Sequence, residues 1–280
     1  MTLENRVVLV TGASSGIGAA TAEALAREGA HVCLLARTES ALTDVADGIR
    51  RAGGTADVYP VDLADFDAVE AVAERIESDV GTPDVIVNNA GAGRFLAIEE
   101  TSPEQAAEMM RVPYLAAFAV TRAFVDGMIE RGSGTVVNVT SVAAYAPWPG
   151  ATAYATARWA MRGFSAALRA DLGETGVHVM LVVAGEVESP YFEHNPGSRE
   201  RLPAISRLFP TLTPGDVADA IVNGLREDRR TVIVPRSLAA VVRLHRLFPR
   251  LVGELVVRTG WNRPKRDDWT RIEVGRRESR

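Results

Sequence analysis

The stretch Thr11-Gly12-Ala13-Ser14-Ser15-Gly16-Ile17-Gly18 decides the fold, because it joins a β-branched run at 6–11 to an alanine-rich run at 17–28. Glycine permits the sharp turn from a strand into a helix, and the first turn of that helix presents unpaired N–H groups that accommodate a pyrophosphate. A glycine-rich turn alone is also compatible with a structural loop, but strand before and helix after favour nucleotide binding. The candidate phosphate-binding residues are Gly12, Ser14, Ser15, Gly16, Ile17 and Gly18.

Strand-like and helix-like segments alternate along the rest of the chain. Strands are predicted at 6–11, 30–36, 57–61, 84–88, 134–139, 177–183 and 231–235. Helices are predicted at 17–28, 39–51, 65–80, 103–131 and 151–174. This alternation predicts an α/β fold in which a doubly wound, seven-stranded parallel sheet is flanked by helices.

The domain organisation follows from the same pattern. No repeat or low-complexity linker divides the chain, so we predict a single domain over residues 1–235. Within it, residues 186–213 contain four prolines and are predicted to form a loop with short helices. Residues 236–261 are predicted to be an amphipathic helical extension, and residues 262–280 a polar tail.

Composition limits the functions open to this chain. Its 280 residues include 31 basic and 36 acidic ones, a net charge of −5, which argues against nucleic-acid binding because that requires a basic stripe. The single cysteine, Cys33, excludes an intrachain disulfide, and the histidines show no metal-ligand spacing. No signal peptide is evident, and no apolar stretch reaches the ~20 residues of a spanning helix. We therefore expect a cytoplasmic protein without a resident metal.

Three later features bring the chain close to a known family. They are Asn88-Asn89-Ala90-Gly91 after the fourth strand, Ser141 after the fifth, and Tyr154 thirteen residues further on. With the glycine-rich turn they resemble the classical short-chain dehydrogenase/reductase family, over about residues 5–235. The resemblance implies a Rossmann fold, hydride transfer between a nicotinamide cofactor and a carbonyl compound or alcohol, and a homodimer or homotetramer. Besides the turn, it implies cofactor contacts from Asp62, Leu63, Asn89, Ala90, Gly91, Val187 and Ser189.

The end of the second predicted strand bears on the choice between NAD and NADP. An acidic residue there would bind the ribose 2′-hydroxyl of NAD, but the sequence reads Leu34-Leu35-Ala36-Arg37-Thr38 and offers no carboxylate. The guanidinium of Arg37 suits a 2′-phosphate, which it can bind in bidentate fashion. The alternative is a solvated arginine that opens the next helix. We predict NADP(H) as the cofactor.

The catalytic group departs from the family pattern at one position. The resemblance implies that Tyr154 is the acid/base, that Ser141 hydrogen-bonds the substrate oxygen, and that a lysine four residues after the tyrosine holds the ribose and favours phenolate. That position is Arg158, and the only lysine of the chain is Lys265. Residues four apart lie on one helix face, so a cation is retained beside Tyr154. Unlike lysine, arginine does not pass on a proton.

Two further departures accompany this one. Pro113 stands where the family has an asparagine that kinks the helix and joins a proton relay to the lysine; proline is predicted to keep the bend and lose the polar side chain. After the sixth strand, the family's Pro-Gly-x-Val-x-Thr reads Ala184-Gly185-Glu186-Val187-Glu188-Ser189. The backbone of Val187 is expected to meet the cofactor carboxamide, and Ser189 replaces the threonine.

The residues around this site suggest the substrate. Tyr145, Trp148 and Pro149, with Phe95, Tyr191 and Phe192, are predicted to form an apolar wall or to pack as aromatic loop residues. An NADP(H)-dependent oxidoreductase acting on a hydrophobic carbonyl compound or its alcohol is the leading hypothesis. Alternatives are a nucleotide-binding protein without redox activity and a non-redox isomerase or cyclase.

The extension carries a second pattern. Residues 237–261 show a broad apolar stripe interrupted at Pro249 and rimmed by arginines. This is typical of an amphipathic helix that contacts a membrane surface, or of one that packs on its own domain or on a partner subunit.

Overall fold

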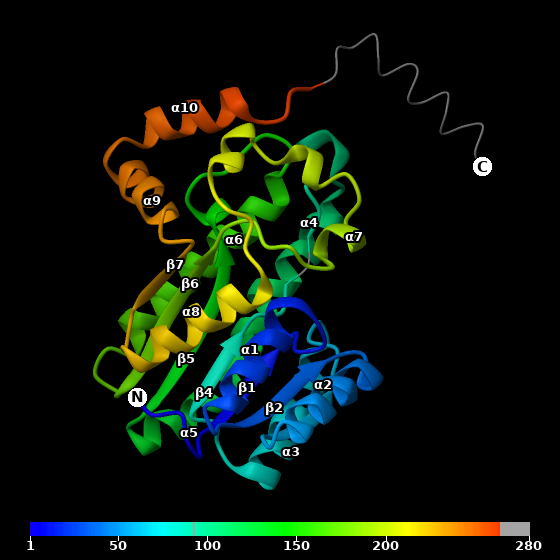
Figure 1. Cartoon of the computed structure of the whole chain (residues 1–280), viewed down its shortest axis with the longest axis vertical. Helices are drawn as coiled ribbons and strands as arrows, with labels where there is room; N and C mark the ends of the chain where they lie inside the picture. The colour runs from blue at the N-terminus through cyan, green and yellow to red at the C-terminus, as the bar shows by residue number, and fades with distance from the viewer. Residues whose placement is uncertain (92, 264–280) are drawn as a thin grey trace, which may run out of the picture.

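A single sheet of seven parallel strands organises the protein. The computed structural model describes residues 1–91 and 93–263 (Figure 1). The strand order is β3-β2-β1-β4-β5-β6-β7, and the strands are β1 Val7–Thr11, β2 His31–Ala36, β3 Thr55–Pro60, β4 Val85–Asn88, β5 Gly134–Ser141, β6 Val177–Ala184 and β7 Thr231–Val234. The doubly wound sheet predicted from the sequence is confirmed. Of the predicted tail, residues 264–280 lie outside the described residues.

Helices cover both faces of this sheet (Figure 1). They are α1 Gly16–Arg27, α2 Glu39–Arg51, α3 Phe66–Val80, α4 Pro103–Met110, α5 Ala116–Arg131, α6 Thr152–Asp171, α7 Tyr191–His194, α8 Pro214–Arg226, α9 Leu238–Leu247 and α10 Pro249–Thr259. One core lies under α1, α2 and α8, and a second lies under α3 and α5.

Successive side chains along each strand point to opposite faces of the sheet and thereby fill the two cores. On β1, Val8 and Val10 enter the first core and Leu9 enters the second, as expected for a strand buried on both faces. Cys33 of β2 lies in the second core, where burial above all raises the pKa of its thiol to about 12. Its thiol therefore behaves as a small apolar group and not as a nucleophile.

The long helix predicted over 103–131 is divided in two. Val112, directly before Pro113, has φ −127° and ψ 104°, and a π-helical turn over Arg111–Leu115 separates α4 from α5. Proline disfavours helical geometry in the residue before it, which explains the break. By length and composition Pro103–Arg131 is apolar enough to cross a membrane, contrary to the sequence expectation. Its Val120, Phe124 and Met128 nevertheless pack in the second core.

Helix α8 was not predicted from the sequence, although its start carries a clear local signal. The hydroxyl of Thr213 accepts from Asp216 N at 3.2 Å, while the Asp216 carboxylate accepts from Thr213 N at 2.7 Å. Pro214 occupies the first helical position, where its missing N–H is not needed. This capping box turns the chain out of the loop at 186–213 and sends α8 along α1.

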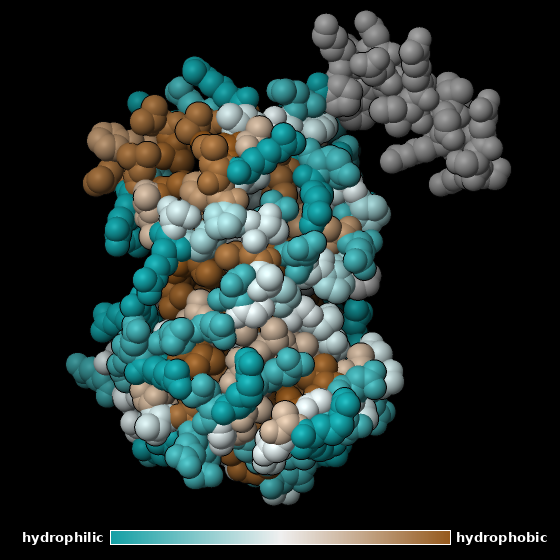
Figure 2. All heavy atoms as spheres, in the orientation of Figure 1, coloured by the Kyte–Doolittle hydropathy of each residue, from teal (hydrophilic) through white to brown (hydrophobic). Residues whose placement is uncertain are grey.

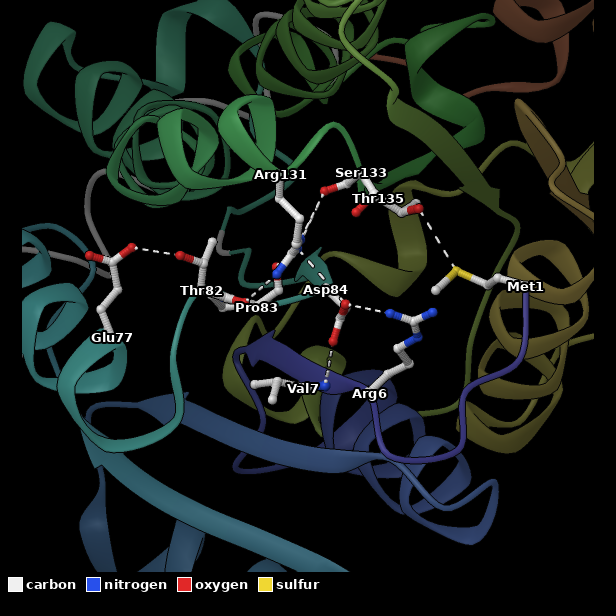
Figure 3. A network of polar contacts seen from close by, with 10 residues as sticks. All are labelled: Met1, Arg6, Val7, Glu77, Thr82, Pro83, Asp84, Arg131, Ser133 and Thr135. Atoms are coloured by element: carbon white, nitrogen blue, oxygen red, sulfur yellow. Dashed lines mark hydrogen bonds and ion pairs between the residues drawn. The ribbon is translucent and has the colours of Figure 1, made fainter.

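A polar network ties β1, β4 and β5 together at the edge of the sheet where these strands begin (Figure 3). The carboxylate of Asp84 accepts from Arg6 Nη1 at 2.9 Å and from Val7 N at 2.9 Å. Arg131, at the end of α5, donates to the carbonyl oxygens of Thr82 and Pro83, both at 2.9 Å. This edge is opposite to the one where the strands end, so the network stabilises the sheet without touching the candidate site.

Replacing Asp84 with alanine is expected to lower the free energy of unfolding by about 2–3 kcal/mol, because two donors lose a charged acceptor at a half-buried position. Thermal and urea denaturation measure the change. The control is Asp126→Ala, which breaks the exposed pair with Arg122 (3.0 Å) and should cost less than about 0.5 kcal/mol. Equal losses in both variants would contradict a structural role for Asp84.

Candidate active site

The candidate site lies where the strand order changes direction, between β1 and β4. Strands β1 to β3 run to one side of this point and β4 to β7 to the other. In such sheets ligands bind beyond the carboxyl ends of the strands at the switch point. The glycine-rich turn follows β1 at this position, and Asn89-Ala90-Gly91 follows β4.

Glycines allow these two segments to touch. Gly12 has φ +66°, and a Cβ there would lie 2.9 Å from Ala90 Cα. A Cβ on Gly18 would lie 2.1 Å from the carbonyl oxygen of Gly12, so α1 starts directly against the turn. Thr11 completes the contact, because its hydroxyl accepts from the backbone N–H groups of Asn89 and Ala90, both at 3.0 Å.

The N-terminus of α1 lies at the glycine-rich turn. Ser15 is the N-cap residue, but its side chain makes no capping hydrogen bond. Gly16 has φ +56°, and a Cβ there would meet Ser189 Cβ at 3.6 Å, which brings the segment after β6 over the turn. A cradle of backbone N–H groups in which Gly12 and Gly18 leave no room for a Cβ fits a dinucleotide pyrophosphate. Ser14 and Ile17 belong to the same turn.

Asn88 serves the sheet and not this cradle. Its Nδ2 donates to Thr121 Oγ1 at 3.0 Å and to Asn138 Oδ1 at 2.9 Å, and Asn138 in turn donates to Ser165 Oγ at 3.0 Å. These buried bonds join β4 to α5, β5 and α6. Asn89, in contrast, donates to the carbonyl oxygen of Thr11 at 3.0 Å and lies against the turn.

Tyr154 and Arg158 lie together on α6. Both are largely buried, with exposed fractions of 7% and 8%, and the guanidinium carbon lies 4.9 Å from the centre of the tyrosine ring. A Cβ on Gly91 would lie 2.9 Å from both terminal nitrogens of Arg158, so the guanidinium is held at the switch point. The buried Nε of Arg158 has no hydrogen-bond partner among the described residues. An orphaned buried donor beside the cradle fits a site for ribose hydroxyls.

Tyr191 adds a contact that the sequence did not reveal. Its hydroxyl donates to the carbonyl oxygen of Gly93 at 2.6 Å, and its ring centre lies 6.3 Å from that of Tyr154. Burial, and secondarily the charge of Tyr154, raises the pKa of Tyr191. Tyr191 therefore stays a neutral donor at physiological pH.

An aromatic cluster surrounds Tyr154. Phe95 is at its centre, with ring-centre distances of 4.6 Å to Tyr154, 5.3 Å to Trp148 and 6.4 Å to Phe192. The buried hydroxyl of Ser198 fixes Phe95 by accepting from its backbone N–H at 3.2 Å. Three members of the predicted wall, Phe95, Trp148 and Phe192, thus come together around the tyrosine, and Tyr191 is the fourth.

Tyr145 does not join this wall, contrary to the sequence expectation. It packs with Leu181, Val183 and Val242 in a separate cluster, and the Arg162 guanidinium lies 3.9 Å from its ring centre. The short helix over Val142–Ala144 turns the chain between Ser141 and Tyr145. Tyr145 is thereby directed toward β6, away from Tyr154.

Ser141 ends β5 at the same edge of the sheet as the turn. Its hydroxyl accepts from Ala143 N at 3.3 Å, and within the described part of the chain no hydrogen bond joins it to Tyr154. The neighbouring Thr140 hydroxyl donates to the carbonyl oxygen of Arg158 at 3.0 Å, which anchors α6 to the end of β5. This bond fixes where Tyr154 and Arg158 lie relative to Ser141.

The remaining candidate residues lie at the ends of neighbouring strands. Arg37 follows β2, is exposed, and makes no ion pair within residues 1–91 and 93–263. Asp62 is also exposed and accepts from Ala64 N at 3.0 Å, whereas Leu63 is buried. Val187 is buried and pairs in parallel with Leu212. The fold thus places a cation after β2 and a carboxylate after β3, at the carboxyl ends of two strands on the same side of the switch point.

A doubly wound parallel sheet with a glycine-rich turn at its switch point defines a dinucleotide-binding protein. The short chain dehydrogenase family model matches residues 6–199. A Mycobacterium tuberculosis protein named "Probable oxidoreductase EphD" is 38% identical over 259 residues, covering 87% of this chain and 43% of that protein. A fatty acyl-CoA reductase from Acinetobacter baylyi is 31% identical over 222 residues, covering 79% of this chain and 72% of that protein.

Solved structures agree with the sequence relatives. A metagenomic short-chain oxidoreductase in complex with NADP has a TM-score of 0.69 and 32% identity, covering 84% of this chain and 98% of that chain. A short-chain dehydrogenase/reductase from Burkholderia phymatum in complex with NAD has a TM-score of 0.80 and 25% identity, covering 90% and 96%. The chain therefore belongs to the short-chain dehydrogenase family, although it spans less than half the length of the mycobacterial relative.

Proposed function

We propose that this protein is a cytoplasmic, NADP(H)-dependent oxidoreductase that interconverts a hydrophobic carbonyl compound and its alcohol. The observation that carries the proposal is the pairing of Tyr154 with Arg158 beside Gly91, at the switch point of a dinucleotide-binding sheet. A buried phenol next to a permanent cation is equipped to release and regain a proton.

Several groups would hold the cofactor. The backbone N–H groups of the glycine-rich turn would bind the pyrophosphate, and Asn89, Ala90 and Gly91 would line the ribose and adenine. Asp62 and Leu63 would contact the adenine. The backbone of Val187 would contact the carboxamide of the nicotinamide, and Ser189 would contact the nicotinamide from the side of the glycine-rich turn. The orphaned Nε of Arg158 fits a ribose hydroxyl. When bound, the reduced nicotinamide supplies a hydride to the carbonyl carbon.

The chain's own residues supply the proton. The hydroxyl of Tyr154 donates its proton to the substrate oxygen, and the Ser141 hydroxyl donates a hydrogen bond to the same oxygen. The Arg158 cation stabilises the phenolate left on Tyr154. Because a guanidinium keeps its protons, and because Pro113 offers no side-chain relay, the phenolate regains its proton from water. Alcohol oxidation runs through the same groups in reverse.

The preference for NADP(H) is the first part to test. NADPH is expected to bind at least tenfold more tightly than NADH, about 1.4 kcal/mol, because the exposed guanidinium of Arg37 is free to bind a 2′-phosphate. Arg37→Ala should remove most of that difference, whereas Arg51→Ala, an exposed arginine at the far end of α2, should leave it unchanged. Titration of both cofactors by fluorescence measures the two affinities. Equal affinities in the wild-type protein would contradict the assignment.

The aromatic cluster around Tyr154 supports a lipophilic substrate. The relative named a fatty acyl-CoA reductase supports the same substrate class. Reduction of a panel of aliphatic and aromatic ketones and aldehydes, followed by loss of NADPH absorbance, tests the activity. If NADPH binds and no carbonyl compound is reduced, the replacement of the family lysine by Arg158 favours a nucleotide-binding protein without redox activity, or a non-redox isomerase or cyclase.

We also propose that the protein forms a homodimer or homotetramer. Large apolar side chains are exposed on the outer face of α5 and α6, among them Phe118 and Trp159. Phe118 and Tyr114 both pack on Phe164, at ring-centre distances of 5.8 Å, which makes one apolar surface from the two helices. Light scattering of the wild-type protein measures the assembly directly.

A further inference from the structure

Helices α9 and α10 have two apolar faces, and among residues 1–91 and 93–263 only one of these faces is covered. Leu238, Val242, Val252 and Val256 are buried against the domain. On the outer face Leu247 is 73% exposed, Phe248 56% and Leu251 60%, and Leu244 and Leu255 extend the same surface. Figure 2 shows this apolar patch where α9 and α10 lie in Figure 1. We call these five residues the outer ridge.

Positive charge borders the outer ridge. Arg243, Arg246 and Arg250 are exposed on the same two helices, and the single acidic residue there, Glu254, already pairs with Arg258 at 3.6 Å. Charge is unevenly distributed along the sequence. Residues 236–280 hold twelve basic and five acidic residues, whereas residues 1–235 hold 19 basic and 31 acidic residues. These parts carry net charges of +7 and −12, so the extension is positive on an otherwise acidic protein.

A second copy of this chain is a poor occupant for the outer ridge. A two-fold contact places the same patch against itself, and would set the arginines of one copy beside those of the other. An anionic membrane surface matches both features, because apolar side chains insert at the level of the headgroups while arginines meet lipid phosphates. The exposed apolar side chains and the positive charge thus both favour an anionic membrane surface as the occupant of the outer ridge.

The outer ridge is firmly joined to the candidate site. Val252 and Val256 of α10 belong to the apolar cluster that contains Phe95, Trp148 and Tyr154. The end of α10 is fixed as well, because Arg201 lies 4.6 Å from the centre of the Trp261 ring. A surface that binds to the outer ridge is therefore separated from the wall around Tyr154 by α10.

We propose that the outer face of α9 and α10 docks the protein onto an anionic membrane surface, with the outer ridge inserted among the headgroups and the arginines on lipid phosphates. Docking places the wall around Tyr154 near the compartment where lipophilic substrates collect. Only this second consequence rests on the proposed function; membrane binding itself does not.

Flotation of the full chain with vesicles, without cofactor or substrate, tests the proposal. Vesicles of phosphatidylcholine containing about one-third phosphatidylglycerol should bind the protein, and pure phosphatidylcholine should bind it at least about tenfold more weakly. Raising the salt concentration should weaken binding to the anionic vesicles, because screening acts on the arginine contribution.

Two double variants separate the contributions. Phe248→Ser with Leu251→Ser, and Arg246→Gln with Arg250→Gln, should each reduce binding to the anionic vesicles by about tenfold or more. The matched control is Ile129→Ser, since Ile129 is exposed near the end of α5, at the opposite edge of the sheet, and this variant should bind like the wild type. Circular dichroism and thermal unfolding verify that all variants are folded.

Three outcomes would overturn the proposal. One is no binding of the wild-type protein to anionic vesicles. Another is equal binding of the variants and the wild type. The third is a change in oligomeric state, measured by sedimentation velocity, in the Phe248→Ser and Leu251→Ser variant with vesicle binding unchanged, which would assign the outer ridge to self-association.

Discussion

Replacing Tyr154 with phenylalanine is expected to lower kcat for carbonyl reduction by ~10²-fold or more, because the proton donor at the substrate oxygen is lost. The ring remains, so its contacts with Phe95 and Arg158 are preserved, and NADPH affinity and thermal stability should change little. Single-turnover measurement of NADPH oxidation on one accepted substrate reports this step separately from substrate binding.

Tyr191→Phe is the matched control for this experiment. Tyr191 lies in the same cluster and is also buried, but its hydroxyl is committed to the carbonyl oxygen of Gly93 and its pKa is raised by burial. Its replacement should affect kcat far less than that of Tyr154, and should act mainly through the position of the loop over residues 186–213. If Tyr191→Phe were the more damaging change, the proton donor would have been assigned to the wrong tyrosine.

The difference between these two tyrosines shows what sequence can establish. The sheet could be predicted because each strand is a short apolar run beside a turn or helix signal, and Val8, Leu9 and Val10 all enter a core. The position of Tyr154 follows from helix periodicity, since Arg158 must lie one turn further along the same face.

Contacts between distant segments were not predictable in this way. The bond from Tyr191 to Gly93 joins residues 98 positions apart, and no local pattern encodes it. Tyr145 was assigned to the wall because it is near Ser141 in sequence, yet the short helix after Ser141 directs it toward β6. The apolar stripe of residues 237–261 was visible, but only packing reveals which side of it meets the domain.

Replacing Arg158 with alanine is expected to lower kcat by ~10²-fold and to weaken NADPH binding, because the phenolate loses its cation and the ribose loses a donor. Arg162→Ala is the control: it lies one turn further along α6, donates to the carbonyl oxygen of Ala144 at 2.9 Å, and faces Tyr145. That variant should lose stability and keep cofactor affinity.

The Arg158→Lys variant tests whether the arginine is a functional replacement for the family lysine or a loss-of-function substitution. The guanidinium fills the space between the Tyr154 ring and Gly91, so closely that it leaves no room for a Cβ on residue 91. A lysine ammonium is more compact and, with Pro113 in place of an asparagine, has no side-chain relay to use its proton. We therefore expect Arg158→Lys to weaken NADPH binding without raising kcat, and only the combination with Pro113→Asn offers the family's conventional relay. If Arg158→Lys alone turned over markedly faster than the wild type, arginine would be a loss-of-function substitution and the non-redox alternative would gain support.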